Sequence, residues 1–190
     1  MSKTVKSALA IVLILGALIF SGVMMKKASK SLEHEAYPLD YLTIVKKKAA
    51  ENGVPLSVVY AMIFQESRFD PNAESADGAR GLMQVMKITH DWIDSYRGES
   101  KGDWDDLFDP EVNLDYGIWL LGYCYREFGN WETVYAAYNA GINRVKGWLS
   151  DPTYSEDGVT LKEIPYAETR KYVEKVSSYR KDYQTVYDFD

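Results

Sequence analysis

From about residue 37 to residue 187, apolar side chains recur every three or four positions, as they do along one face of an α-helix. The alternation of apolar and polar residues that marks a strand is not evident, and no internal repeat appears. Pro38 and Pro55 suit the first turns of helices, and Gly53 suits the end of one. The pattern therefore predicts an all-α domain.

Helices are expected at positions bounded by these proline and glycine residues. Their predicted ranges are 39–50, 55 to the break at Asp70-Pro71, 89–96, 110–128, 131–139, 141–149 and 166–186. The loop 72–80 is rich in Gly, Ala and Asp, and we expect a short irregular hairpin in this region.

The N-terminal segment is of a different kind. Residues 8–25 are apolar or small except for one hydroxyl, with Lys residues on both sides. At 1.5 Å per residue this run is about 27 Å long, close to the hydrocarbon thickness of a bilayer. A cleaved signal peptide is the alternative, but Met24-Met25-Lys26 offers no good small-residue cleavage site. We predict an uncleaved signal anchor and linker over residues 1–36, with a second domain over 37–190.

Charge and cysteine content exclude several functions. Five of the 22 basic residues lie within residues 1–30, which contain no acid, so the remainder carries 17 basic against 28 acidic side chains. Such a domain lacks the basic footprint that nucleic acid requires. Cys124 is the only cysteine and lies in an apolar helical pattern, which favours a buried hydrophobe. His34 and His90 have no partners at ligand spacing, so neither a metal nor another cofactor is predicted.

Glu66 is the leading candidate for catalysis. On a helix it lies on the same face as Val59, Met62 and Ile63, at the C-terminal end of an apolar stripe. A carboxyl buried without a counter-charge has a raised pKa, which suits a general acid near neutral pH. The alternative is a structural glutamate that is paired with Arg68 or Arg80.

Three further motifs follow Glu66-Ser67 in the chain. They are Gly81-Leu82-Met83-Gln84, then Ala137-Tyr138-Asn139-Ala140-Gly141, and a C-terminal cluster in which Ile164-Pro165-Tyr166 leads to Glu168-Thr169-Arg170-Lys171-Tyr172-Val173. In this order and at these intervals, the set resembles the catalytic domain of the soluble lytic transglycosylases, from about residue 37 to about residue 187. The resemblance implies a lysozyme-like (goose-type) helical fold that cleaves the glycan strands of bacterial peptidoglycan.

The resemblance also implies a reaction with one carboxylate. In this family a single acid protonates the glycosidic oxygen and then takes the proton of the C6 hydroxyl, which attacks C1 and leaves a 1,6-anhydro-muramyl end. An intramolecular nucleophile of this kind has a high effective concentration. Ordinary glycosidases use two carboxylates. Asp70, Glu74 and Asp77 are near Glu66 in sequence, but they lie on a loop that turns the chain.

The same resemblance assigns the substrate-binding residues. They are Ser75, Met83, Gln84, Tyr138, Asn139 and Tyr172. Met83 and Gln84 would lie at the floor of the cleft, Tyr138 and Asn139 would contact the sugar, and the Tyr172 hydroxyl would lie near Glu66. For each, core packing or helix capping is the alternative role.

The function predicted from these arguments is a membrane-anchored peptidoglycan lytic transglycosylase with its catalytic domain on the extracytoplasmic side. Its partners would be glycan strands, the membrane through residues 8–25, and an envelope protein complex. One alternative is a goose-type lysozyme that hydrolyses the same bond. Another is a catalytically silent glycan-binding module of the envelope, for which loss of Glu66 would be the sequence signature.

Overall fold

The computed structural model describes residues 20–25 and 32–189, and it divides the chain into the units Met1–Pro38 and Leu39–Asp190. In the first unit, residues 20–25 and 32–36 are helical. The predicted membrane segment, 8–25, lies outside the described residues except for its last six positions. Within the described ranges, no helix is both long enough and apolar enough to cross a bilayer.

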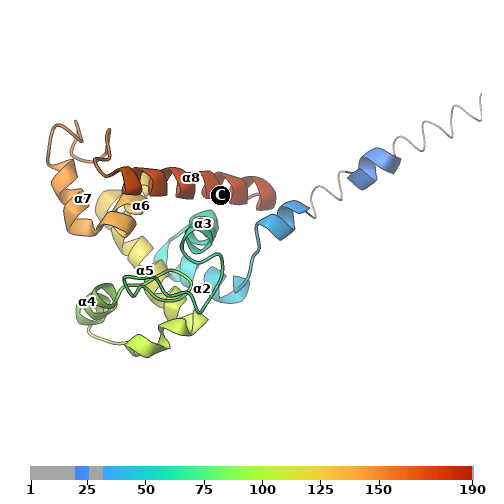
Figure 1. Cartoon of the computed structure of the whole chain (residues 1–190), viewed down its shortest axis with the longest axis horizontal. Helices are drawn as coiled ribbons and strands as arrows, with labels where there is room; N and C mark the ends of the chain where they lie inside the picture. Colours follow the sequence, from blue (N-terminus) through green and yellow to red (C-terminus); the bar gives the residue numbers. More distant parts are fainter. Residues whose placement is uncertain (1–19, 26–31, 190) are drawn as a thin grey trace, which may run out of the picture. The chain divides into compact units, whose positions relative to one another are not determined.

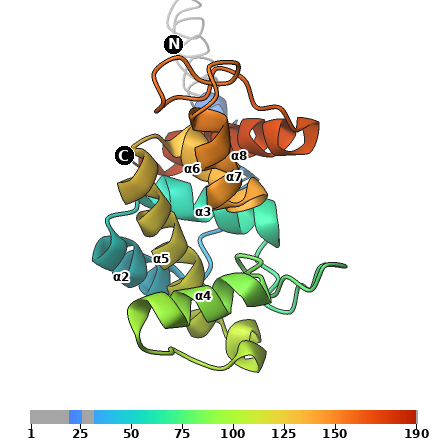
Figure 2. The ribbon, with the colours of Figure 1, turned by 90° about the vertical axis from the view of Figure 1, so that its left-hand side faces the viewer.

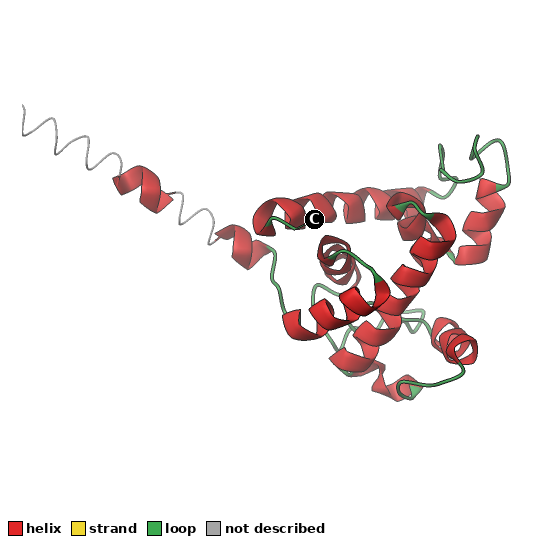
Figure 3. Cartoon of the chain, turned by 180° about the vertical axis from the view of Figure 1, so that it is seen from behind, coloured by secondary structure: helices red, strands yellow, loops and turns green. Residues whose placement is uncertain are grey.

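The second unit consists of helices joined by loops (Figure 3), so the all-α prediction is confirmed for the described residues. Its helices are α2 (Leu42–Asn52), α3 (Leu56–Glu66), α4 (Lys87–Arg97), the 3₁₀ helix η1 (Trp104–Phe108), α5 (Pro110–Phe128), α6 (Trp131–Ala140), α7 (Ile142–Leu149) and α8 (Ala167–Tyr187). The sequence pattern did not predict η1, since a five-residue 3₁₀ helix is too short to show a repeat of apolar residues.

Helix α3 lies at the centre of this unit, packed against α2 and α8 (Figures 1 and 2). Every residue from Ser57 to Ile63 is buried, so α3 is covered on all sides and not along one stripe as the periodicity suggested. Tyr60 stacks on Tyr183 of α8 with ring centroids 5.5 Å apart. The centre of the hydrophobic core is therefore the helix that ends in Glu66.

Two helix boundaries differ from the prediction for the same reason. Helix α2 begins at Leu42 and not at residue 39, because Tyr41 has a φ of 59°, a left-handed conformation that a right-handed helix cannot include. Helix α3 ends at Glu66, ahead of Asp70-Pro71, because Arg68 and Phe69 have φ values of 54° and 67°. The role predicted for Pro38 in the first turn is therefore wrong.

The loop between α3 and α4 contains the expected irregular hairpin. Arg80 forms isolated antiparallel bridges with both Glu74 and Val85. The Arg80 side chain donates to the Glu74 carboxylate at 3.1 Å and to the Asp105 carboxylate at 2.8 Å. Its guanidinium carbon also lies 4.6 Å from the centroid of the Trp104 ring. Arg80 thus joins the loop to η1.

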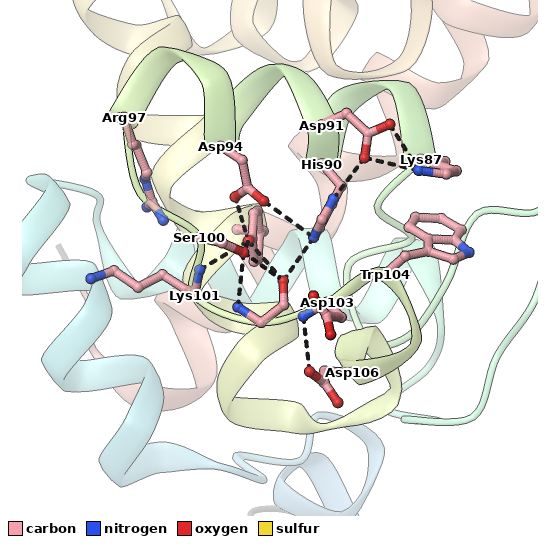
Figure 4. A network of polar contacts seen from close by, with 12 residues as sticks. Lys87, His90, Asp91, Asp94, Arg97, Ser100, Lys101, Asp103, Trp104 and Asp106 are labelled. Carbon is pink, nitrogen blue, oxygen red and sulfur yellow. Dashed lines mark hydrogen bonds and ion pairs between the residues drawn. The ribbon is translucent and has the colours of Figure 1, made fainter.

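Helix α4 is held to the loop that follows it by a polar network (Figure 4). The His90 ring contacts the Asp91 carboxylate and the Gly102 carbonyl oxygen, each at 3.0 Å, and stacks on Tyr116 at 4.7 Å. The Tyr116 hydroxyl donates to Asp94 at 2.5 Å. Because buried polar groups require partners, these bonds fix the loop after α4 against α5.

Candidate active site

Glu66 is the last residue of α3, and its carboxylate accepts a hydrogen bond from the Tyr172 hydroxyl of α8. The same hydroxyl lies 3.6 Å from the sulfur of Met62, one turn earlier on α3. Tyr172 is 7% exposed, whereas Glu66 is half-buried. The carboxyl group therefore lies at the boundary between the core and the surface, where a ligand can reach it.

The electrostatics of Glu66 are set by burial and by one hydrogen bond. Burial raises the pKa of its carboxyl from 4.5 to about 7, and the Tyr172 hydrogen bond partly opposes this shift by stabilising the anion. Arg68 donates instead to the Tyr179 hydroxyl at 2.8 Å, and Arg80 is paired as described above. Neither arginine forms an ion pair with Glu66 in the described structure. The reading of Glu66 as half of a structural salt bridge is therefore not supported.

The backbone of Met83 connects the second and third motifs. Its carbonyl oxygen accepts a hydrogen bond from the Tyr138 hydroxyl at 2.8 Å. Burial raises the pKa of the Tyr138 hydroxyl well above its usual value, and the nearby Glu66 carboxylate raises it further. The Met83 side chain is fully buried, so it supports this region from the core side. Met83, Tyr138 and Glu66 are thus brought together.

Ser75 and Gln84 use their polar groups within the loop. The Ser75 hydroxyl oxygen accepts from the Ala79 N–H at 3.0 Å, although the residue itself is exposed. The Gln84 amide donates to the carbonyl oxygens of Ala73 and Gly81, both at 3.0 Å. Both side chains therefore stabilise the loop 73–84, and their contact with a sugar remains a prediction.

Asn113 of α5 is a residue that the sequence reasoning missed. Its amide nitrogen donates to the carbonyl oxygens of Arg80 and Leu107, and its amide oxygen accepts from the Met83 N–H, all at 2.8 Å. Gly81 makes this possible, because a Cβ there would lie 2.3 Å from the Asn113 amide nitrogen. The available signal was an amide between Val112 and Leu114 near the start of α5, which by itself does not indicate a role.

Ser67, directly after Glu66, adds a second connection to the same segment. Its hydroxyl donates to the Leu82 carbonyl oxygen at 2.8 Å and approaches the Ile63 carbonyl oxygen at 3.3 Å. The C-terminal end of α3 is thereby fixed to the Gly81–Gln84 segment. The Glu66-Ser67 motif and the Gly81–Gln84 motif are therefore held together by a direct hydrogen bond.

A cavity of about 260 Å³ opens beside Tyr172. It is lined by Gln65, Asn139, Glu168, Lys171, Tyr172 and Lys175. Larger cavities of about 510 and 420 Å³ lie along another face of α8 and between α4 and α7. Neither of these is lined by Glu66 or Tyr172, so size does not identify the site, and the smaller cavity is the one next to the acid.

The described residues include no group of three or more His, Cys, Asp or Glu side chains that could hold a metal ion. Cys124 is buried, and burial raises the pKa of its thiol to about 12, so it stays protonated.

Comparison with known families identifies this arrangement. The model of the transglycosylase SLT domain matches residues 43–158, more than half of the chain. The chain belongs to this family. The match contains Glu66, the Gly81–Gln84 segment and Tyr138. Tyr172 lies beyond the matched residues, but α8 places its hydroxyl against the Glu66 carboxylate.

The relatives of this SLT domain are much longer proteins. The soluble lytic murein transglycosylase of Escherichia coli is 37% identical over 159 residues, which is 80% of this chain and 24% of the relative. The membrane-bound lytic murein transglycosylase C of Yersinia pestis is 29% identical over 192 residues, covering 89% of this chain and 53% of that protein. The chain thus spans about a quarter of the length of the soluble relatives.

Solved structures confirm the SLT fold. The 70 kDa soluble lytic transglycosylase of Escherichia coli matches with a TM-score of 0.71 and 32% identity, over 80% of this chain and 25% of that one. A Pseudomonas aeruginosa lytic transglycosylase, solved as an inactive glutamate-to-glutamine mutant, matches with a TM-score of 0.68 and 32% identity, over 78% and 24% of the two chains. The lysozyme-like helical architecture expected from the motifs is therefore confirmed.

Proposed function

We propose that this chain is a peptidoglycan lytic transglycosylase that cleaves the β-1,4 bond between N-acetylmuramic acid and N-acetylglucosamine. The observation that carries the proposal is the Glu66 carboxyl, whose pKa burial raises to about 7 beside the Tyr172 hydroxyl. A group that is half protonated near neutral pH can both give and accept a proton there.

The proposed reaction uses Glu66 twice. The protonated carboxyl donates to the glycosidic oxygen while the bond from that oxygen to C1 breaks. The resulting carboxylate, stabilised by the Tyr172 hydroxyl, takes the proton of the C6 hydroxyl of the same muramyl residue. The C6 oxygen then bonds to C1, which closes the 1,6-anhydro ring and returns Glu66 to its protonated form. No water is consumed, and atoms and protons balance.

The surroundings of Glu66 favour this route over hydrolysis. Burial and the Tyr172 hydrogen bond account for its pKa shift, and no other carboxylate in the described part of the chain contributes to it. A hydrolase of the usual kind would place a second carboxylate close enough to act on water or on C1. The names of the relatives agree, since they are lytic murein transglycosylases.

Two findings about relatives support the site. A 70 kDa soluble lytic transglycosylase has been solved as a complex with bulgecin A. The Pseudomonas aeruginosa enzyme is described as inactive when one glutamate is replaced by glutamine. We infer that Glu66 is the corresponding acid here. Tyr138, Asn139 and Tyr172 would then bind substrate around it, with Ser75, Met83 and Gln84 forming or supporting the floor of the cleft.

We further infer that residues 8–25 anchor the protein in the membrane, with the catalytic domain outside. The apolar run and its flanking lysines support this, as does the relative named membrane-bound lytic murein transglycosylase C. The test is fractionation of cells that make the full chain or a form starting at Ser31. The full chain should require detergent for extraction, and the shortened form should be soluble and active. Recovery of full-activity protein from the medium that begins after Met25 would favour a cleaved signal instead.

The test of the reaction is mass spectrometry of the fragments released from purified peptidoglycan sacculi. Anhydro-muramyl ends are expected. Reducing ends, which carry one additional water, would identify the chain as a goose-type lysozyme. An absence of released fragments, with binding to sacculi retained, would identify it as a silent glycan-binding module.

A further inference from the structure

Two lysines line the cavity beside the proposed catalytic acid. Lys171 and Lys175 are one turn apart on α8, and both border the same cavity of about 260 Å³ as Tyr172 and Asn139. Tyr172 donates to Glu66, so this cavity lies one side chain away from the carboxyl that would act on the substrate.

Neither lysine has an anionic partner within the part of the chain that the structure describes. Five other lysines do: each forms an ion pair at 4.0 Å or less, and they are Lys48, Lys87, Lys101, Lys146 and Lys162. The chain as a whole has a net charge of −6, so anionic side chains are abundant. Two like charges at i and i+4 on a helix repel one another slightly. The pair therefore places two positive charges at this cavity without an ion pair to any described carboxylate.

We propose that Lys171 and Lys175 bind the carboxylate groups of the peptide that a muramyl residue carries next to the bond being cleaved. This inference rests on the proposed function. The hydroxyl and N-acetyl groups of the glycan are neutral, whereas the attached peptide brings free carboxylates. The cavity is also smaller than the roughly 300–1,000 Å³ of a typical small-molecule site, so it suits a side branch of the substrate.

Glu168 shapes the same site by limiting what can enter. It borders the cavity from the preceding turn of α8, so the lining carries two positive charges and one negative charge. A peptide with an ammonium group as well as carboxylates fits this distribution better than a simple anion does. The glycan would lie along Glu66 and Asn139 while its peptide extends over α8.

The test compares two substrates with a matched pair of double variants. The substrates are glycan strands that carry peptides and the same strands stripped of peptides by an amidase. Lys171→Gln combined with Lys175→Gln removes the proposed site. Lys46→Gln combined with Lys47→Gln is the control, because these lysines of α2 are also exposed, also unpaired among the described residues, and border none of the cavities above.

The first double variant should lower kcat/KM by roughly threefold to tenfold on peptide-bearing strands, as expected for two partly solvated charge contacts. It should affect stripped strands less, because the amidase removes the carboxylates of the peptide and leaves only one on each muramyl residue. The control should change neither. The loss should shrink as salt is raised, since exposed charges are screened. An equal loss on both substrates, or no loss on either, would overturn the inference.

Binding to a non-cleaving Glu66→Gln protein separates this inference from the proposed function. Calorimetry should give tighter binding of peptide-bearing strands than of stripped strands, and the two lysine substitutions should abolish the difference. If the wild-type protein cleaves neither substrate, the proposed function fails, and the binding comparison still decides the inference. Equal affinity for both kinds of strand would reject it.

Discussion

The Tyr172 hydroxyl donates a hydrogen bond to the Glu66 carboxylate across 106 positions of sequence. This bond joins the end of α3 to α8, which packs along α3 in the core. The protonation of the acid is thus coupled to the docking of the C-terminal helix. Any change that moves α8 should alter the pKa of Glu66 as well as the shape of the site.

Replacing Glu66 by Gln should lower turnover by roughly 10²–10⁴-fold or more, because the amide keeps the shape but has no transferable proton.

Glu66→Gln should also change how stability depends on pH. Below about pH 4.5 the Glu66 carboxyl is protonated in both the folded protein and the unfolded chain. Between about pH 4.5 and about pH 7 it loses its proton in the unfolded chain and keeps it in the folded protein. Stability conferred by the native protonated form is therefore lost as pH rises through this window, by about 3 kcal/mol in total.

Thermal melts of wild type and Glu66→Gln from pH 4 to pH 8 measure this effect. The variant should gain relative stability across the window and level off above about pH 7. Parallel curves would contradict a raised pKa in the native protein. Retention of near wild-type fragment release would remove Glu66 from the mechanism.

Tyr172→Phe should lower the rate by about tenfold or more, since a hydrogen bond to a charged group is lost while the ring still packs. Because that bond lowers the pKa of Glu66, its removal should shift the alkaline limb of the kcat/KM profile to higher pH. Tyr179→Phe is the control: its hydroxyl, also on α8, accepts from Arg68 and does not contact Glu66. An unchanged pH profile for Tyr172→Phe would assign this residue to packing alone.

The sequence predicted the helices and the acid because both leave local signals. Gly53 ends α2 in the left-handed conformation that glycine favours, and the apolar run of α3 leads directly to Glu66. What it did not predict depends on contacts distant in sequence. Asn113 is one of several polar residues on α5, and its role is not visible until its three hydrogen bonds to the Arg80, Met83 and Leu107 backbones are known.

The same difference between local signals and contacts distant in sequence applies to the site residues. The raised pKa of Glu66 was predictable from an apolar face, but the absence of an arginine partner was not, because Arg68 and Arg80 have alternative partners in other helices. The left-handed residues Tyr41 and Arg68 moved helix ends without any glycine or proline to mark them. Backbone strain at such positions depends on tertiary packing, which the spacing of apolar residues in the sequence does not reveal.

Asn113→Ala and Asn139→Ala should separate support of the fold from contact with substrate. Asn113→Ala leaves the Leu107 carbonyl oxygen and the Met83 N–H without their partner, whereas the Arg80 carbonyl oxygen keeps the Val85 N–H, so it should cost about 2–4 kcal/mol of stability. Asn139 is exposed and lines the cavity, so Asn139→Ala should change stability by less than about 0.5 kcal/mol and lower activity. Denaturant unfolding and fragment release measure both. A stable Asn113→Ala protein would show that water replaces the amide.

Gly81→Ala and Gly78→Ala test whether the Gly81–Gln84 segment requires close backbone approach or only a left-handed turn. Both glycines have positive φ, 71° and 81°, so each substitution strains the backbone by about 1–2 kcal/mol. Only at Gly81 would the new Cβ clash, at 2.3 Å from both the Asn113 amide nitrogen and the Leu107 carbonyl oxygen, whereas Gly78 has nothing within 4 Å. Gly81→Ala should therefore lower stability by several kcal/mol more and displace Met83, the residue whose carbonyl oxygen accepts from Tyr138. Equal losses of stability for the two variants, measured by denaturant unfolding, would mean that backbone conformation alone selects glycine here.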